Sequence, residues 1–193
     1  MKKFETLQFN IGELKGISAK TIEEHLKLYA GYVKHANLIL EKIEEYRVDY
    51  DKNSYAIGEL QRRFGFEYNG IKNHEIYFES LSDGSKPLSL NSKLKEAIST
   101  EFESFDIWLE SFKKIALTRG IGWAMLCYDK KENRLLNAWI DEQHLGLLQN
   151  CTTILALDMW EHSYYLDYTP AEKKKYVEAF FENLNWETVE GNF

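Results

Sequence analysis

The first part of the chain carries apolar residues at helical spacing. Between Ile22 and Ile43 they recur every three or four positions, which is the period of one helix face. Ser18 precedes this run and suits a helix N-cap, because its hydroxyl can accept a hydrogen bond from an amide of the first turn. The pattern predicts one long helix that ends near Tyr46.

Helical spacing continues after this helix, with interruptions. Residues 54–65 and 71–81 are predicted to form two further helical pieces. They are expected to break near Gly65 and Gly70, because glycine weakens a helix. The stretch 82–91, SDGSKPLSLN, gathers the glycine, proline and small polar residues typical of a linker.

The second half of the chain changes its period. A helical run is predicted from about 92 to 118, and a C-terminal helix over 171–182, after Pro170. Between them, short apolar or alternating runs indicate strands. These runs are GWAMLCYD (122–129), RLLNAWID (134–141) and TTILALDM (152–159). This order of elements predicts an α+β protein in two parts.

Composition narrows the classes of protein. The chain has 193 residues, and 44% of them are hydrophobic, which is enough for a sizeable core. The net charge of −7 argues against nucleic-acid binding, which usually relies on a basic surface. Neither the opening MKKFETLQFNIG nor any later run is apolar for long enough to span a bilayer. We therefore expect no nucleic-acid partner, no membrane association and a cytoplasmic location.

One short motif offers chemistry. Asp158 and His162 lie four residues apart in DMWEH, at the end of a predicted strand. A helical or tightly turned backbone can aim both side chains at one point. A carboxylate with several imidazoles suits iron or manganese, and also zinc. Taken alone, the pair is better explained by an aspartate that caps a helix and a partly exposed histidine.

Two more histidines belong to predicted helices. His25 shares a helix face with Tyr29 and Tyr32, at spacings of four and seven residues. His74 follows Asn73 on a later helical piece. Each histidine alone fits a buried side chain whose hydrogen bonds are satisfied.

Five segments together resemble the iron/manganese superoxide dismutases. DMWEHSYYLDY (158–168) is similar to the D-x-W-E-H-A-Y-Y signature of that family. SAKTIEEHLKLYAGYV (18–33) and NHEIYF (73–78) resemble its first helix and the N-H-x-x-F-W segment of its second. GIGWAML (120–126) and YVEAFFENLNWETV (176–189) resemble a G-S-G-W strand and the C-terminal helix with its N-W-x-x-V ending. The order of the segments is that of the family.

The resemblance implies a fold and a metal site. The fold is an N-terminal helical hairpin domain (1–83) plus a C-terminal α/β domain (88–193) with a small three-stranded antiparallel sheet, and the metal lies between the domains. One manganese or iron ion is expected per chain. Its implied ligands are His25, His74, Asp158 and His162.

Other positions match family residues around the metal. Tyr32 is implied at the substrate funnel, and Trp123 and Trp160 in the pocket wall. Glu161 is expected to reach the partner subunit's ligand histidine, and Tyr165 to lie at the interface. A homodimer or a dimer of dimers is therefore implied.

The choice of metal depends on a glutamine that bonds the metal-bound solvent. In manganese-type members it precedes the D-x-W-E-H motif, and a glycine lies four residues before the second ligand. Gln143 and Gly70 match that arrangement, so manganese is preferred over iron. His144 competes for the same place, because a shift of one residue would exchange the two. Tyr29 stands where the family usually has a gateway histidine, and it completes the set of candidate catalytic residues.

The implied reaction is the conversion of two superoxide ions to oxygen and hydrogen peroxide. Because the substrate is an anion and the chain is acidic, a locally positive approach is expected, with Lys27, Lys34 and Lys173–Lys175 as candidates. Two alternatives stay open. One is a relative without catalysis or with altered activity, which keeps the metal site and the dimer, as the Tyr29 change indicates. The other is a non-haem iron oxygenase with two histidines and a carboxylate, against which a third histidine argues.

Overall fold

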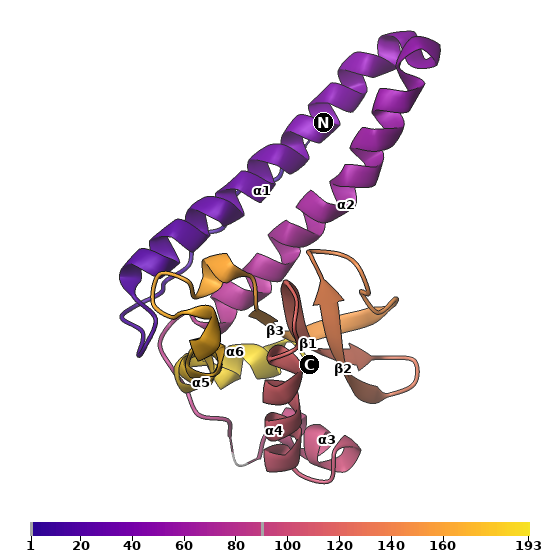
Figure 1. The fold of residues 1–193 in the computed structure, drawn as a ribbon. Helices are drawn as coiled ribbons and strands as arrows, with labels where there is room; N and C mark the ends of the chain where they lie inside the picture. The colour runs from indigo at the N-terminus through magenta and orange to yellow at the C-terminus, as the bar shows by residue number, and fades with distance from the viewer. Residues whose placement is uncertain (1, 90) are drawn as a thin grey trace.

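The N-terminal half is a long helical hairpin. The computed structural model describes residues 2–89 and 91–193. Helix α1 (Ala19–Tyr46) ends in a short 3-10 turn, and the chain returns as α2 (Tyr50–Ser80). The two helices lie side by side, and their far end projects beyond the rest of the molecule (Figure 1).

Helix α1 begins where its sequence predicts. The Ser18 hydroxyl accepts a hydrogen bond from the Thr21 amide at 3.1 Å, as an N-cap should. The prediction of two separate helical pieces over 54–65 and 71–81 is wrong, because α2 continues unbroken through Gly65 and Gly70. Each glycine costs a helix about 1 kcal/mol, and packing along the length of α1 offsets that cost.

The extended N-terminal strap, residues 2–17, lies along the hairpin. The Asn37 amide on α1 accepts a hydrogen bond from Phe4 N at 2.9 Å and donates one to Phe4 O at 2.9 Å. Further along the strap, the Leu7 amide donates to the Tyr29 hydroxyl at 3.0 Å, and the Phe9 ring packs edge-on against Tyr29. Side chains of α1 therefore satisfy backbone groups of a segment that forms no helix or strand of its own.

The predicted linker follows α2 and is held by both the N-terminal strap and the C-terminal part. The Asp83 amide donates to Asn10 O at 2.9 Å, and the Lys86 amide donates to Leu184 O at 3.1 Å. Leu90, inside the predicted linker, lies outside the described residues, as does Met1.

The next segment forms two helices where the sequence predicted one. Helix α3 (Lys93–Glu101) ends before Glu103, whose φ of 71° cannot continue a right-handed helix. Ser104 then caps α4 (Phe105–Ala116) by accepting a hydrogen bond from the Ile107 amide at 3.1 Å. A capping serine inside an apolar pattern is the local signal that separates the two helices.

A three-stranded antiparallel sheet forms the centre of the C-terminal part. Strands β1 (Gly122–Asp129), β2 (Arg134–Asp141) and β3 (Cys151–Asp158) are arranged in the order β2-β1-β3. Trp123 lies opposite Asp158 and Gly122 lies opposite Asp141. The register therefore brings the start of β1 and the ends of β2 and β3 to one edge of the sheet.

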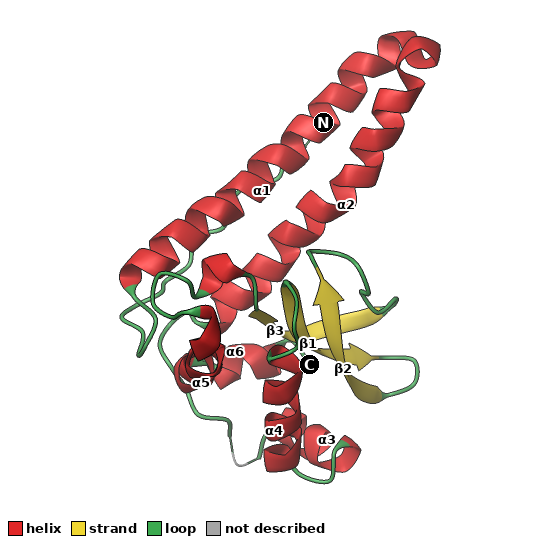
Figure 2. Ribbon diagram, viewed as in Figure 1, coloured by secondary structure: helices red, strands yellow, loops and turns green. Residues whose placement is uncertain are grey.

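The C-terminal helices pack beside this sheet with α3 and α4 (Figure 2). The predicted helix over 171–182 is a 3-10 turn (Pro170–Glu172) continued by α5 (Lys173–Asn183). A short helix, α6 (Trp186–Gly191), follows and was not predicted, because six residues show too little periodicity. The predicted fold class, a helical hairpin plus a domain with a small antiparallel sheet, is confirmed. Within the described residues, no helix has the length and apolar character to cross a membrane.

Candidate metal centre

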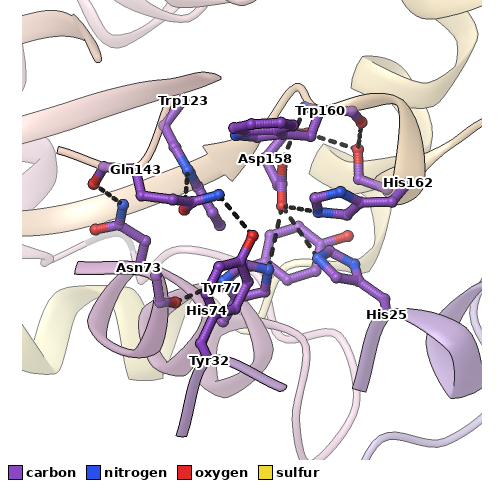
Figure 3. A network of polar contacts seen from close by, with 12 residues as sticks. His25, Tyr32, Asn73, His74, Tyr77, Trp123, Gln143, Asp158, Trp160 and His162 are labelled. Carbon is purple, nitrogen blue, oxygen red and sulfur yellow. Dashed lines mark hydrogen bonds and ion pairs between the residues drawn. The ribbon is translucent and has the colours of Figure 1, made fainter. Parts of the chain in front are cut away.

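Four side chains from four separate elements converge where the hairpin meets the sheet. His25 comes from α1, His74 from α2, Asp158 from the last position of β3, and His162 from the 3-10 turn Glu161–Ser163. One ligand atom from each lies within 4.8 Å of the others (Figure 3). The first three side chains are fully buried, whereas His162 is 19% exposed.

The Asp158 carboxylate is the centre of this cluster. Its Oδ2 lies 3.0 Å from His25 Nε2, 3.1 Å from His162 Nε2 and 3.6 Å from His74 Nε2. Its other oxygen, Oδ1, accepts a hydrogen bond from the Trp160 amide at 2.8 Å. That bond fixes the carboxylate, so Oδ2 faces the three imidazoles (Figure 3).

The His74 ring shows that these residues fit a metal ion. Its Nδ1 lies 2.6 Å from Gly70 O. A carbonyl can only accept, so Nδ1 carries the proton and Nε2 carries a lone pair. That Nε2 is buried and has no hydrogen-bond partner among the described residues. A buried lone pair that faces a carboxylate is costly unless a cation lies between them.

The protonation states of the cluster also suit a metal. Burial lowers the pKa of His74 to about 3 and holds the pKa of His25 below its usual value. Burial acts to raise the pKa of Asp158, but the charge and hydrogen bonds of His162 and His25 outweigh it and hold that pKa below its usual range. The neutral imidazoles of His25 and His74, with the ionised Asp158 carboxylate, suit the donor set of iron or manganese.

A hydrogen-bonded amide lies beside the cluster. Gln143 follows β2 in the chain and is fully buried. Its Oε1 accepts from Trp123 Nε1 at 2.9 Å, and its Nε2 donates to the Tyr32 hydroxyl at 3.0 Å (Figure 3). Because Trp123 can only donate, the orientation of the amide is fixed, with its N–H groups toward Tyr32.

Asn73 is a member of this network that the sequence reasoning did not single out. Its Nδ2 donates to the Gln143 backbone oxygen at 2.9 Å, across the contact between α2 and the loop after β2. The only signal for it was its place immediately before His74 in the segment NHEIYF. That position alone does not reveal which distant backbone group the side chain meets.

His144 and Tyr29 point elsewhere. The His144 ring lies 5.8 Å, edge-on, from the Phe66 ring, so the structure places Gln143 and not His144 beside Tyr32. Tyr29 is 1% exposed, and its hydroxyl donates to Glu75 Oε1 at 3.2 Å while it accepts from the strap.

The remaining candidates divide between the cluster and the surface. Trp123 is fully buried and lies edge-on, 5.0 Å from the His74 ring. Trp160 stacks on His162 at 5.8 Å. Glu161 is exposed and Tyr165 is 59% exposed in the single chain, so neither packs into this chain's own core.

Comparison with known proteins gives two family matches that together span nearly the whole chain. Residues 3–82 match the model described as the alpha-hairpin domain of iron/manganese superoxide dismutases. Residues 90–192 match the model of the C-terminal domain of the same family.

Individual relatives cover most of the chain. A superoxide dismutase [Fe] of Cupriavidus metallidurans is 36% identical over 184 residues, which are 94% of this chain and 90% of that protein. A superoxide dismutase [Mn] of Mycolicibacterium smegmatis is 34% identical over 192 residues, 97% of this chain and 90% of the relative. A superoxide dismutase [Fe] of Pyrobaculum aerophilum is 34% identical over 180 residues, 90% of this chain and 82% of the relative.

Proposed function

This chain belongs to the iron/manganese superoxide dismutase family, and on that premise we propose that it converts two superoxide ions to oxygen and hydrogen peroxide at one bound metal ion. The observation that carries the proposal is the cluster of three imidazole nitrogens and one carboxylate oxygen within 4.8 Å of one another. Family membership argues against the oxygenase alternative.

The metal would be held by His25, His74, Asp158 and His162. When bound, a manganese or iron ion supplies a one-electron couple that takes an electron from one superoxide and returns it to the next. Hydrogen bonds within the chain orient the ligands before a metal ion binds. Hydrogen bonds from Trp160 N to Asp158 and from His74 to Gly70 O orient two of the donors.

We propose manganese as the preferred ion, with iron as the other candidate. Relatives of both kinds match at similar identity, 36% for one iron protein and 34% for one manganese protein. Sequence identity therefore does not distinguish the two metals, and the preference for manganese depends on the residues beside the site. Gln143 reaches the site from the loop after β2, and Gly70 leaves the neighbouring space to Tyr32. This is the arrangement expected of manganese-type members.

Tyr32 is the proposed group for relaying the two protons that the reaction consumes, and Gln143 would tune the redox potential of the bound ion through hydrogen bonds. The Tyr32 phenol accepts from the Gln143 amide, and its own proton is free to bond a substrate or solvent oxygen. Burial, together with the charges of Asp158 and Glu67, raises the pKa of Tyr32 well above its usual value, so the phenol stays protonated at neutral pH. A phenol in that state can donate a hydrogen bond to a superoxide ion next to the metal.

The aromatic residues Trp123 and Trp160 are proposed to wall the pocket. Both rings pack against ligand histidines, at 5.0 Å from His74 and 5.8 Å from His162. They exclude bulk water from the ligands and leave Tyr32 and His162 partly exposed. His144 contacts Phe66 and contributes to the same wall.

We further propose a homodimer or a dimer of dimers, with Glu161 and Tyr165 at the interface. Support comes from the exposed fractions of neighbouring large side chains, 59% for Tyr165 and 58% for Leu166. The domain boundaries are proposed at 1–83 and 88–193. A cytoplasmic location is supported by the free thiols of Cys127 and Cys151.

Superoxide decay in the presence of metal-loaded protein tests the proposal. The purified chain is reconstituted separately with manganese and with iron, its metal content is measured, and superoxide loss is followed by stopped flow. We expect turnover with about one ion per chain, and faster turnover in the manganese form. Stoichiometric metal without superoxide loss would favour the non-catalytic alternative, and an active iron form beside an inactive manganese form would reverse the metal preference.

A further inference from the structure

Among the described residues around the cluster, those that are partly exposed form what we call its open side. His25, His74, Asp158 and Gln143 are each fully buried. The partly exposed neighbours are Tyr32, Phe66, His144, Trp160 and His162. An ion that approaches the cluster from solvent is therefore expected to pass these side chains.

Arg63 lies against this open side. Its guanidinium carbon is 3.7 Å above the centroid of the Phe66 ring, a cation–π contact. The Phe66 ring is 6.0 Å from Tyr32 and 6.5 Å from Trp160. Stacking on Phe66 thus holds a positive charge beside the same aromatic rings that border the path to the metal.

A buried carboxylate balances this charge. Arg63 Nε donates to Glu67 Oε1 at 2.9 Å, one helical turn further along α2. The Arg63 side chain is 51% exposed, whereas that of Glu67 is only 6% exposed. The pair therefore presents its cation to solvent and keeps its anion inside.

Three of the five lysines expected to guide an anion contact other groups. Lys27 pairs with Glu23 at 2.6 Å on α1, and Lys175 pairs with Glu172 at 2.6 Å. Lys173 lies over the Tyr164 ring. Lys34 follows Tyr32 by two residues and therefore leaves α1 on a different face.

We propose that Arg63 draws the superoxide anion to the open side of the cluster, and that Glu67 sets the strength of this attraction. The proposal rests on the dismutase function proposed above. With a net charge of −7, the molecule as a whole repels an anion, so a fixed cation beside the path has a strong local effect.

The fields of both groups extend to the Tyr32 hydroxyl, which bonds Gln143 beside the cluster. Glu67 acts to raise the pKa of Tyr32, and Arg63 acts to lower it. Because the two charges have opposite signs, removing the Arg63 charge should lower the electrostatic potential at this hydroxyl, and removing the Glu67 charge should raise it. A purely structural ion pair would not behave in this way, because losing either partner would be harmful.

Three variants separate charge from structure. Arg63→Gln leaves a local excess of one negative charge, Glu67→Gln leaves one positive charge, and the double variant restores neutrality. In metal-loaded protein, we expect kcat/KM at low ionic strength to fall roughly two- to fivefold in the first and to rise by a similar factor in the second. The double variant should return to the wild-type rate, and salt should reduce all of these differences.

The neighbouring residue supplies a matched control. Arg62 lies on the same helix, is 74% exposed, and pairs with Glu59, which is itself 46% exposed. Arg62→Gln makes the same change in net charge and should leave kcat/KM within experimental error. Equal losses in Arg62→Gln and Arg63→Gln would mean that only net charge matters, and the proposal would be wrong.

A second probe separates this inference from the proposed function. The association rate of azide, a small monovalent anion, is followed by visible absorption of the metal-loaded variants. We expect the same order as for superoxide, with Glu67→Gln fastest and Arg63→Gln slowest. If superoxide is not consumed but azide shows this order, the dismutase function fails and the role of Arg63 stands. Losses in both single variants, with either anion, would overturn the role of Arg63.

Discussion

At the scale of single residues, the orientation of each donor is set by the chain itself. His74 Nδ1–H donates a hydrogen bond to Gly70 O, and Asp158 Oδ1 accepts one from the Trp160 amide. These bonds leave His74 Nε2 and Asp158 Oδ2 facing each other at 3.6 Å. A site whose ligands are already oriented loses little side-chain entropy when the metal binds.

Gln143 and His144 are adjacent in sequence but should differ in function. Gln143→Ala removes the group that bonds Tyr32 at 3.0 Å and leaves Trp123 Nε1 without its acceptor. We expect turnover to fall roughly 10–100-fold at unchanged metal content, as is typical when a hydrogen-bond partner beside a metal site is lost. Superoxide decay normalised to bound metal measures the change.

His144→Ala is the matched control for that substitution. The imidazole contacts Phe66, and its removal should reduce turnover by much less than the Gln143 change. A larger loss in His144→Ala than in Gln143→Ala would show that the histidine is the group that acts on the bound solvent.

Gly70 is required because the Tyr32 ring occupies the space of a side chain. A Cβ at position 70 would lie 2.5 Å from Tyr32 Cδ1, whereas one at Gly58, on the same helix, would meet no atom within 4 Å. Gly70→Ala should displace Tyr32, destabilise the fold by about 1–3 kcal/mol and lower turnover. Gly58→Ala should stabilise it by about 0.5–1 kcal/mol.

Urea denaturation of both glycine variants, with superoxide decay of each, measures these effects. Full activity and unchanged stability in Gly70→Ala would mean that Tyr32 can move without consequence. That result would contradict the proposed role of the Tyr32–Gln143 hydrogen bond.

At the scale of elements, Tyr29 connects the N-terminal strap to the hairpin. Tyr29→Phe leaves the Leu7 amide without its acceptor and removes a donor to Glu75. We expect a loss of about 1 kcal/mol in the free energy of unfolding and faster hydrogen exchange at the Leu7 amide. Tyr55→Phe, which changes a phenol that is 82% exposed, is the control.

Metal content should be the same in both tyrosine variants. Unchanged exchange at Leu7 in Tyr29→Phe would contradict the role of Tyr29 in holding the strap. Loss of metal in that variant would instead indicate that Tyr29 acts on the adjacent His74, whose ring lies 6.5 Å away.

The elements themselves were predictable to the extent that they follow a period. The long helix from Ser18, the β1–β2 hairpin and the buried strand β3 have strong patterns, and the structure contains all three. The unbroken α2 was missed because packing against α1 and the Tyr32 ring beside Gly70, not local propensity, decide its course. The division between α3 and α4 depends on the backbone of Glu103 and on the Ser104 cap, a local signal that the continuous helical period obscured.

Much of the site could be proposed only through the resemblance. His25, His74 and Asp158 lie far apart in sequence, and each alone is explained by burial or capping. Their convergence depends on the sheet register and on how the hairpin meets the sheet, neither of which is a local property. The Arg63–Glu67 pair had a local signal, opposite charges four residues apart, but nothing in the sequence placed it beside Phe66.

At the scale of the whole molecule, the site joins the two halves of the chain. The hairpin gives His25 and His74, and the C-terminal part gives Asp158 and His162. A bound ion would therefore stabilise the contact between the halves as well as each half. Without it, hydrogen bonds compensate the buried Asp158 carboxylate, but the buried His74 Nε2 has no hydrogen-bond partner among the described residues.

The stability of the metal-free protein should therefore depend on pH. His74 has a pKa of about 3 in the fold and 6.5 when unperturbed, so between these values the unfolded chain binds a proton that the folded chain does not. Stability is then fully present above pH 6.5 and is lost as the pH falls toward 3. From pH 7 to pH 5 the loss from His74 should be about 2 kcal/mol.

Urea denaturation of the metal-free protein at the two pH values measures this loss. The His25 pKa is lowered in the same direction and adds to the effect. His74→Gln should reduce the pH dependence, because it removes one of the two groups. A metal-free protein equally stable at both pH values would contradict the buried, neutral state of these imidazoles.

The proposed function requires that four side chains, far apart in sequence, hold one redox-active ion, and anomalous diffraction from crystals of the manganese-loaded protein would locate that ion. We expect a single strong manganese peak per chain, bonded to His25, His74, Asp158 and His162. A peak at any other place, or stoichiometric manganese with no peak among these four residues, would contradict it.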